Sequence, residues 1–182
     1  MHTFQQMNQT YPAKILLVVI GSIAPEILTY LHHVIESAFD CHCVAGASLP
    51  IPEYAYVPQR RQYSARAILE SLERGRDSHV LGVVDLDLFV PELNFVFGLA
   101  DPAGKHAVIA LPRLREGFYG SRENSSLFLE RTAKEAIHEL GHVYGLGHCR
   151  NRGCVMSFSN SLLDTDRRSR RFCTRCMSKL QA

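Results

Sequence analysis

The sequence has little of what marks a membrane protein or a polyelectrolyte. Its longest apolar run, Ile15–Ile20, extends loosely to Ala24 and is far shorter than the ~20 residues that a membrane-spanning helix needs. The formal net charge is +2, from 20 basic and 18 acidic residues, which is too balanced for a chain whose whole surface binds a polyanion. Internal repeats and low-complexity segments are absent, and a hydrophobic content of 46% excludes disorder, collagen-like repeats and coiled coil.

The length indicates one domain, and the N-terminal pattern favours a cytoplasmic protein. At 182 residues the chain can build its own core. Lys14 ahead of the apolar run is a weak signal-peptide feature, but Pro25 and the helical pattern after it favour a first β-strand. We therefore expect a cytoplasmic monomer with an upper lobe at 1–148 and a C-terminal lobe at 149–182.

Apolar periodicity predicts an α/β fold that is mostly parallel in its early part. Strand patterns occur at Lys14–Gly21, Cys41–Ala45, His79–Leu88, Asn94–Leu99 and His106–Leu111. Helical patterns occur at Pro25–Phe39, with Ser22 as a capping residue, at Ser64–Arg74, which Gly75 ends, and from about Ser121 to Tyr144. The segment after residue 149 lacks sustained periodicity apart from a short helix at its end, so it needs another source of order.

The long helix ends in a cluster of histidines around one glutamate, His138-Glu139-Leu-Gly-His142-Val-Tyr-Gly145-Leu-Gly-His148. Residues four apart on a helix lie one above the other, so His138 and His142 can reach one ion. Gly145 lets the chain leave the helix and return His148 as a third ligand. Zn²⁺ suits three neutral nitrogen ligands and keeps a fourth position for water. Glu139, on the flank facing that water, can take its proton as it attacks a carbonyl and pass the proton to the leaving amine.

An amphipathic helix with two incidental histidines would explain neither His148 nor Gly145. The extended pattern instead resembles that of the metzincin metallopeptidases. Their further signature is a methionine in a tight turn that forms an apolar floor beneath the zinc. By this resemblance Met156, eight residues after His148, is the Met-turn residue.

Four of the six cysteines fall in the C-terminal lobe, at Cys149, Cys154, Cys173 and Cys176. The cytosol is reducing, so they do not indicate a disulfide framework. A Cys-x₂-Cys knuckle with a Cys-x₄-Cys pair has the spacing of a closed, four-thiolate structural zinc site. Such a zinc ion stabilises a segment whose hydrophobic patterning is weak. A disulfide pair and an iron–sulfur cluster are the alternatives.

Cys149 directly follows His148, so one peptide unit would anchor both zinc sites. We infer that the structural zinc fixes the loop that presents His148 and Met156. The histidine motif, the methionine and the cysteines together are similar to those of the archaemetzincins, over Ala136–Leu180. The segments 82–98 and 114–120 also resemble that family.

The archaemetzincin resemblance implies a zincin fold of metzincin type. It assigns the site residues to the same roles that the motif and the cysteine spacing indicate. The histidines are then the catalytic zinc ligands, Glu139 the general base, and the four late cysteines the second site. The sheet is expected to be mixed, with one antiparallel edge strand that pairs with the peptide substrate. From the order of the strands along the chain, we place this edge strand at Asn94–Leu99.

Two parts of the sequence bear on how this protein would differ from other metzincins. Phe158 stands where astacins and serralysins place a tyrosine that assists the metal, and Tyr119 is the one substitute that we consider. Without it the zinc must polarise the carbonyl largely unaided. Cys41-His-Cys43 could offer a zinc-blocking thiol, but we interpret it as a buried strand and expect no self-inhibitory switch.

The sequence thus predicts a single catalytic domain, a zinc-dependent peptidase that acts on peptides or proteins with one catalytic and one structural zinc ion. Cleavage of internal or of N-terminal bonds stays open, because Asp85 and Asp87 could hold a free amine or form a solvated strand end. One alternative is a zinc hydrolase of a non-peptide substrate.

The other alternative is a nucleic-acid-binding zinc knuckle, because residues 149–182 carry eight Lys and Arg against two Asp. Four of these are Arg167, Arg168, Arg170 and Arg171. Four thiolates and one Zn²⁺ together contribute −2, so part of the positive charge is local compensation. We expect no nucleic-acid partner and no membrane partner.

Overall fold

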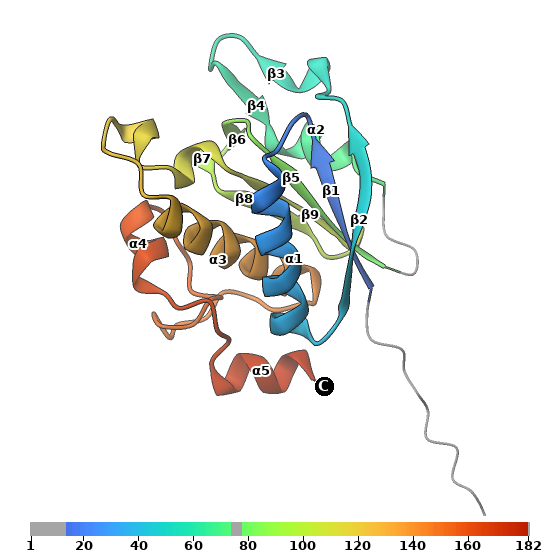
Figure 1. Cartoon of the computed structure of the whole chain (residues 1–182), viewed down its shortest axis with the longest axis vertical. Helices are drawn as coiled ribbons and strands as arrows, with labels where there is room; N and C mark the ends of the chain where they lie inside the picture. Colours follow the sequence, from blue (N-terminus) through green and yellow to red (C-terminus); the bar gives the residue numbers. More distant parts are fainter. Residues whose placement is uncertain (1–13, 74–77, 182) are drawn as a thin grey trace, which may run out of the picture.

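The structure, a computed structural model, describes residues 14–73 and 78–181 (Figure 1). Its main sheet has five strands in the order β2-β1-β5-β9-β8. The first four are parallel, and β8 runs antiparallel to β9 at the edge. The bounds are β1 (Lys14–Ile20), β2 (His42–Leu49), β5 (His79–Val84), β8 (Gly98–Asp101) and β9 (His106–Ala110). The predicted α/β class, with a mixed sheet and an antiparallel edge strand, is confirmed.

A second, smaller sheet lies beside the first, with its strands in the order β3-β4-β6-β7. Its first two strands lie where no strand was predicted, and its other two overlap the strands predicted at His79–Leu88 and Asn94–Leu99. Its strands are β3 (Tyr56–Val57), β4 (Gln62–Ser64), β6 (Leu88–Val90) and β7 (Leu93–Val96).

Two predicted strands are therefore each divided in two. The strand expected at His79–Leu88 ends at Val84, because the following Asp85 and Asp87 turn to ion pairs with arginines. The strand expected at Asn94–Leu99 breaks at Phe97, where the chain passes from β7 in one sheet to β8 in the other. The antiparallel edge of the main sheet is thus Gly98–Asp101 rather than Asn94–Leu99.

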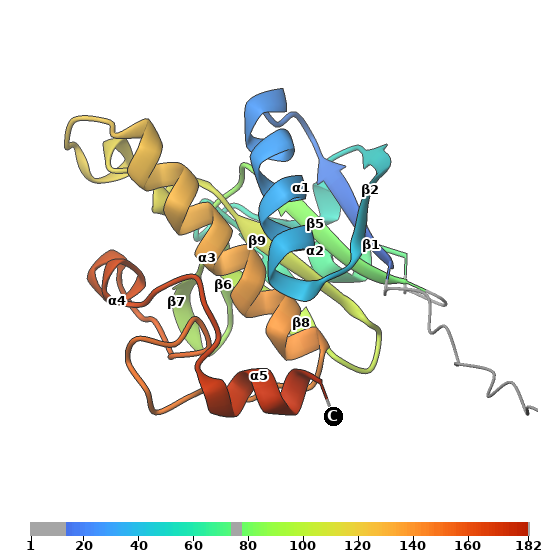
Figure 2. The ribbon, with the colours of Figure 1, turned by 60° about the horizontal axis from the view of Figure 1, so that its bottom comes forward.

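Helices cover both faces of the main sheet (Figures 1 and 2). α1 (Pro25–Phe39) and α3 (Ser125–Val143) pack on one face, and α2 (Ala65–Glu70) packs on the other. The strands alternate accordingly: Leu81 and Val83 of β5 face α1 and α3, whereas Val80 and Val84 face α2.

The helix ends differ slightly from the sequence prediction. α1 begins after Ala24, and Ser22 does not cap it. α2 ends at Glu70, and both Arg74 and Gly75 of its predicted end lie outside the described residues. α3 starts at Ser125 because the Asn124 side chain accepts a hydrogen bond from the backbone N–H of Leu127. Three short 3₁₀ turns occupy Glu53–Ala55, Pro112–Leu114 and Gly117–Tyr119.

The C-terminal part of the chain, residues 149–181, packs against α3 from the side opposite the sheet (Figure 2). It contains α4 (Leu162–Arg167), which the sequence did not predict, and the expected final helix α5 (Thr174–Leu180). Its small core gathers around Val155 and Met156. As a result α3 is buried continuously from Arg131 to Gly141. In residues 14–73 and 78–181 no helix has the length and apolar character needed to span a membrane.

Candidate metal centres

Three histidine side chains converge where α3 ends. His138 and His142, one helical turn apart, place their Nε2 atoms 3.1 Å from each other. At Gly145 the backbone φ is 84°, a left-handed conformation that favours glycine, and the chain turns back. The His148 ring centroid then lies 5.4 Å from that of His138 and 4.9 Å from that of His142. One ligand atom from each of the three histidines lies within 4.8 Å of the others.

Hydrogen bonds to backbone carbonyls set the orientation of two of these imidazole rings. His138 Nδ1 lies 2.8 Å from the Val155 oxygen, and His142 Nδ1 lies 2.7 Å from the Leu146 oxygen. A carbonyl only accepts, so each Nδ1 carries the proton and each Nε2 keeps its lone pair. Two imidazole lone pairs 3.1 Å apart repel each other unless a cation lies close to both. The donor set therefore fits a metal ion held by neutral imidazoles, as Zn²⁺ is in catalytic sites.

The pKa values of all three histidines are lowered, which favours their neutral form. Burial lowers the pKa of His138 to about 2, and the charges of Arg168 and His142 add to this effect. Burial also lowers the pKa of His142 and of His148. Protons and metal ions compete for the same lone pairs, so the lowered pKa values favour metal binding at neutral pH.

Glu139 lies between α3 and the edge strand and is 7% exposed. Gly98 of β8 passes so close that a Cβ there would lie 2.5 Å from Glu139 Cγ. Burial raises the pKa of Glu139 to about 8, Glu135 adds to the rise, and Arg168 opposes it. A cation at the histidines would lower this pKa again, because a positive charge favours the carboxylate. The predicted general base is thus a buried carboxylate that lines the same cleft as the histidines.

This cleft has a volume of about 360 Å³ and lies between the strands and the chain that follows Met156. Most of its surface is apolar and comes from β7, β8 and their surroundings. Its lining comprises Val90, Leu93, Phe95–Ala100 and Pro102 on the strand side, Phe158–Asn160 opposite, and Glu135, His138, Glu139, His142, His148 and Arg168.

Met156 is fully buried against the middle of α3. Gly141 makes the room, because a Cβ at that position would overlap Met156 Sδ. The Met156 oxygen accepts a 2.8 Å hydrogen bond from the Cys149 N–H, the residue next to His148. The predicted Met-turn residue therefore packs against the turn of helix that separates His138 from His142.

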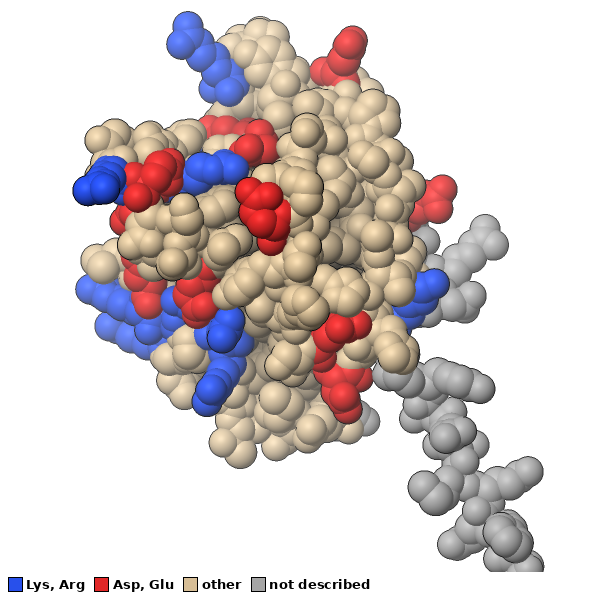
Figure 3. Space-filling model, in the orientation of Figure 1, with Lys and Arg blue, Asp and Glu red and all other residues tan. Residues whose placement is uncertain are grey.

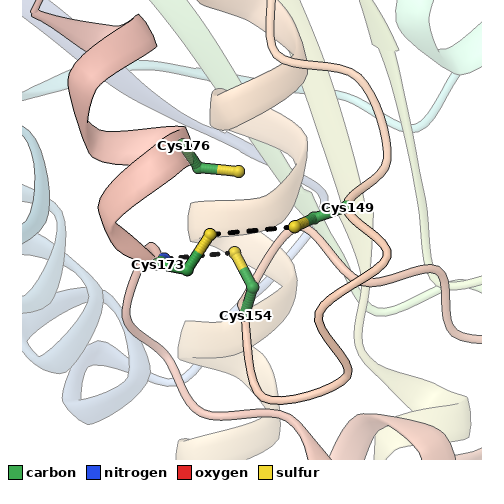
Figure 4. Close-up of side chains that lie close together, drawn as sticks. All are labelled: Cys149, Cys154, Cys173 and Cys176. Atoms are coloured by element: carbon green, nitrogen blue, oxygen red, sulfur yellow. Dashed lines mark hydrogen bonds between the residues drawn. The ribbon is translucent and has the colours of Figure 1, made fainter.

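The four late cysteines form a second cluster, in which the side chains point toward one another (Figure 4). Cys149 Sγ and Cys173 Sγ are 3.8 Å apart, too far for a disulfide, and the Cys173 N–H donates to Cys154 Sγ at 3.3 Å. Zn–S bonds of ~2.3 Å in a tetrahedron place sulfurs about 3.8 Å apart. With Cys176 completing the set, the cluster fits a four-thiolate zinc ion.

Several residues considered from the sequence lie away from the cleft. Tyr119 does not line it, and the Tyr119 hydroxyl donates to the Arg113 oxygen instead. Phe158 does line it, with its ring centroid 5.0 Å from that of His148. Asp87 forms a two-bond ion pair with Arg113 and Asp85 one with Arg115, and neither aspartate reaches the cleft.

The remaining two cysteines are buried as the strand interpretation requires. Cys43 lies in β2 and is 2% exposed, and Cys41 immediately precedes that strand. Burial raises the pKa of Cys41 to about 12 and that of Cys43 to about 11, so both are thiols at neutral pH. Neither belongs to a cluster of potential metal ligands among the described residues.

Sequence reasoning missed two residues that border the cleft, Glu135 and Arg168. Arg168 belongs to the run of arginines that the sequence analysis weighed as part of a nucleic-acid-binding zinc knuckle, yet it is 2% exposed and pairs with Glu135. A signal was present: Glu135 lies one helical turn before Glu139, so the two carboxylates share one face of the helix.

Comparisons with known proteins agree with this geometry. Residues 48–182 match the family described as peptidase family M54. An archaemetzincin of Methanocaldococcus jannaschii is 45% identical over 168 residues, 92% of this chain and 93% of that protein. The crystal structure of an archaemetzincin from Methanopyrus kandleri has a TM-score of 0.82 at 39% identity and covers 97% of both chains. That of an archaemetzincin from Archaeoglobus fulgidus, complexed with malonate, has a TM-score of 0.81 at 36% identity, over 91% of this chain and 99% of that one.

Replacing one thiol of the cluster should remove one zinc ion. We expect Cys154→Ala to retain one zinc per chain instead of two, measured by atomic emission after gel filtration. A structural zinc ion contributes several kcal/mol, so Tm should fall by about 10 °C at roughly 2–4 °C per kcal/mol. Cys43→Ala is the matched control, since Cys43 and Cys154 are equally buried, and it should keep both ions. Two ions retained in Cys154→Ala would place the second metal elsewhere.

A side chain at Gly98 should displace Glu139. Gly98→Ala puts a methyl group 2.5 Å from Glu139 Cγ and 2.7 Å from Glu139 Oε1, which is too close, so the carboxylate must move. Misplacing a reacting group by about 1 Å can cost about 100-fold in rate, and we expect kcat to fall by about 10- to 100-fold. Zinc content should stay at two ions per chain, which separates this effect from loss of the metal. Unchanged kcat would show that catalysis does not need Glu139 in this position.

Proposed function

Because the chain belongs to peptidase family M54, the archaemetzincins, and is a zinc-dependent metallopeptidase, we propose which of its side chains hydrolyse the peptide bond. His138, His142 and His148 hold the catalytic zinc ion, and Glu139 is the general base. The observation that carries this assignment is the pair of unprotonated Nε2 atoms 3.1 Å apart beside a buried carboxylate. Met156 serves as the Met-turn residue, and Cys149, Cys154, Cys173 and Cys176 hold the structural zinc ion.

The protein's contribution to the reaction is a proton transfer next to a Lewis acid. When bound, a zinc ion at the histidines polarises the substrate carbonyl and lowers the pKa of water. The Glu139 carboxylate takes the proton from the attacking water and returns it to the leaving nitrogen. That return matters because an amide nitrogen departs readily only as a neutral amine. Glu139 is 7% exposed, so bulk water has little access to the proton during this transfer.

The edge strand offers the substrate a place to bind. Among the described residues β8 is the last strand of the main sheet, and Gly98, Leu99 and Ala100 line the cleft. An extended peptide can add to such an edge through main-chain hydrogen bonds, which recognise the backbone rather than particular side chains. A peptide or protein substrate laid along β8 would pass directly over Glu139, which Gly98 contacts.

Three further properties belong to this proposal. The protein acts as a single catalytic domain with an upper lobe at 1–148 and a C-terminal lobe at 149–182. It works as a monomer. It works in the cytoplasm, where the reducing environment keeps cysteine thiols available as metal ligands.

The basic segment does not favour nucleic-acid binding. Figure 3 shows Lys and Arg interspersed with Asp and Glu on the side that carries α4. Arg168 is buried, Arg167 lies 3.7 Å from Asp164, and Arg170 lies 3.5 Å from Glu130. Three of the eight basic residues are therefore engaged within the protein, and we propose no nucleic-acid partner. A non-peptide substrate is likewise favoured by no feature of the cleft.

Removing the proposed base should abolish peptide cleavage while leaving both metals bound. We expect the zinc-loaded protein to cut members of a diverse peptide library, read by mass spectrometry. Glu139→Gln should reduce the cutting rate by about 100- to 10,000-fold, the usual contribution of general acid–base catalysis. Glu53→Gln, an exposed glutamate outside the cleft, should leave the rate unchanged.

The fragments also show which bonds are cut. Internal fragments identify an endopeptidase, and stepwise loss of N-terminal residues identifies an aminopeptidase. Asp85 and Asp87 are engaged by arginines, so an aminopeptidase would have to bind the free amine with other groups. Equal cutting by the protein and its Glu139→Gln variant would remove Glu139 from the proposed role.

A further inference from the structure

An ion pair lies behind the histidines in the interior of the protein. Glu135 of α3 and Arg168, which follows α4, are each 2% exposed. Arg168 Nη2 donates to Glu135 Oε1, and the same oxygen accepts a 3.1 Å hydrogen bond from the Thr165 hydroxyl. Glu135 is one helical turn before Glu139 and three residues before His138, so the pair adjoins the proposed catalytic centre.

The other end of the guanidinium holds the Met156 turn. Arg168 Nη1 donates to the Ser157 oxygen at 2.9 Å and to the Val155 oxygen at 3.2 Å. These two carbonyls stand on either side of Met156 in the chain. One arginine side chain thus connects the helix, through Glu135, to both flanks of the methionine.

The same arginine also lies next to His138, a proposed zinc ligand. Arg168 Nη1 lies 3.0 Å from His138 Nδ1, and both nitrogens face the Val155 oxygen. Arginine has no acceptor, and the Val155 carbonyl fixes the proton on Nδ1, so the two groups share one carbonyl as donors. The position of that carbonyl therefore sets the direction of the His138 ring, and Arg168 sets the position of the carbonyl.

We propose that Glu135 and Arg168 are positioning residues of the catalytic metal centre. Glu135 anchors the guanidinium to α3, and Arg168 holds the carbonyls of Val155 and Ser157, which orients His138 and fixes Met156 against Gly141. The inference rests on the proposed function, in which His138 binds the metal. Partners that orient metal-ligating histidines commonly affect metal affinity by 10- to 100-fold.

Stability alone does not account for such a pair. Burying two charges costs desolvation, and apolar residues of similar size often replace a buried pair without loss of stability. Arg168 Nε finds no hydrogen-bond partner among the described residues, so the position of this side chain does not satisfy all of its own donors. Its Nη atoms, by contrast, converge on the carbonyl that orients His138.

The chain provides a matched control on the same helix. Arg131 and Asp166 form a two-bond ion pair at 2.7 Å that also joins α3 to the α4 segment. Arg131 is 3% exposed, so it is as buried as Arg168. Arg131 also donates to the Leu114 oxygen and lies 3.9 Å from Glu116 Oε1, and none of these contacts involves Val155 or His138. Loss of this pair should weaken packing without reorienting a proposed metal ligand.

The test compares zinc affinity at the histidine centre with stability. Zinc release to a chelator is followed in the whole protein, and His142→Ala identifies which released ion belongs to this centre. We expect Arg168→Met and Glu135→Gln to weaken zinc binding there by about 10- to 100-fold. Arg131→Met and Asp166→Asn should change it less than threefold. Cobalt(II) substitution adds a spectroscopic readout, in which only the first two variants should shift the bands of the nitrogen-ligated ion.

Two more variants separate positioning from stability. Arg168→Lys keeps the charge but cannot reach Glu135 and both carbonyls at once, so zinc affinity should stay reduced. The double variant Glu135→Leu/Arg168→Met removes both charges and should recover much of the lost Tm, while the zinc affinity stays low. Recovery of both quantities to the values of the unchanged protein would overturn the inference, as would equal effects in the Arg131 and Asp166 variants.

Failure of the proposed function gives a different result. If His142→Ala binds as many zinc ions as the unchanged protein, the histidines are not the metal ligands and the proposed function fails. If His142→Ala binds one zinc ion fewer, but Arg168→Met and Glu135→Gln bind zinc as tightly as Arg131→Met and Asp166→Asn do, only the positioning role fails.

Discussion

The enclosure of α3 is the constraint on which the rest of this structure depends. From Arg131 to Gly141 every residue of the helix is buried, although the segment contains an arginine, a lysine, two glutamates and a histidine. Charged groups are costly in a protein interior unless they find partners. The chain that encloses the helix must therefore supply a partner for each, and it does so differently on the two sides of the helix.

The side of α3 that faces α4 is satisfied by the protein itself. Asp166 pairs with Arg131, the Thr165 oxygen accepts from Lys134, and Arg168 pairs with Glu135. The side that faces β8 is not satisfied in this way, since the Nε2 atoms of His138 and His142 face each other and the Glu139 side chain lies against β8 at Gly98. A metal ion and a water molecule would complete that side, so the proposed catalytic centre occupies the half of the helix whose polar groups the described part of the protein leaves without partners.

The sequence predicted the parts of the site that depend on local geometry. Helical periodicity is enough to place His138 above His142, and cysteine spacing is enough to suggest four thiolates, which the structure brings together. It did not predict that the strand at 79–88 would stop at Val84, because that break depends on arginines some 30 residues later in the chain. Nor did it predict the burial of Arg168, since neighbouring arginines at 167 and 170 are indeed exposed and only the three-dimensional packing distinguishes them.

Gly98 shows how closely substrate binding and proton transfer are joined in this fold. The edge strand must lie far enough into the cleft to align a peptide with the histidines, yet Glu139 occupies the space directly below it. Any side chain at that point of β8 would push the strand and the carboxylate apart. A glycine resolves the conflict, and it does so at the first residue after the chain leaves the small sheet at Phe97. The same local arrangement therefore divides the predicted strand and brings the proposed base, Glu139, close to the proposed substrate-binding edge.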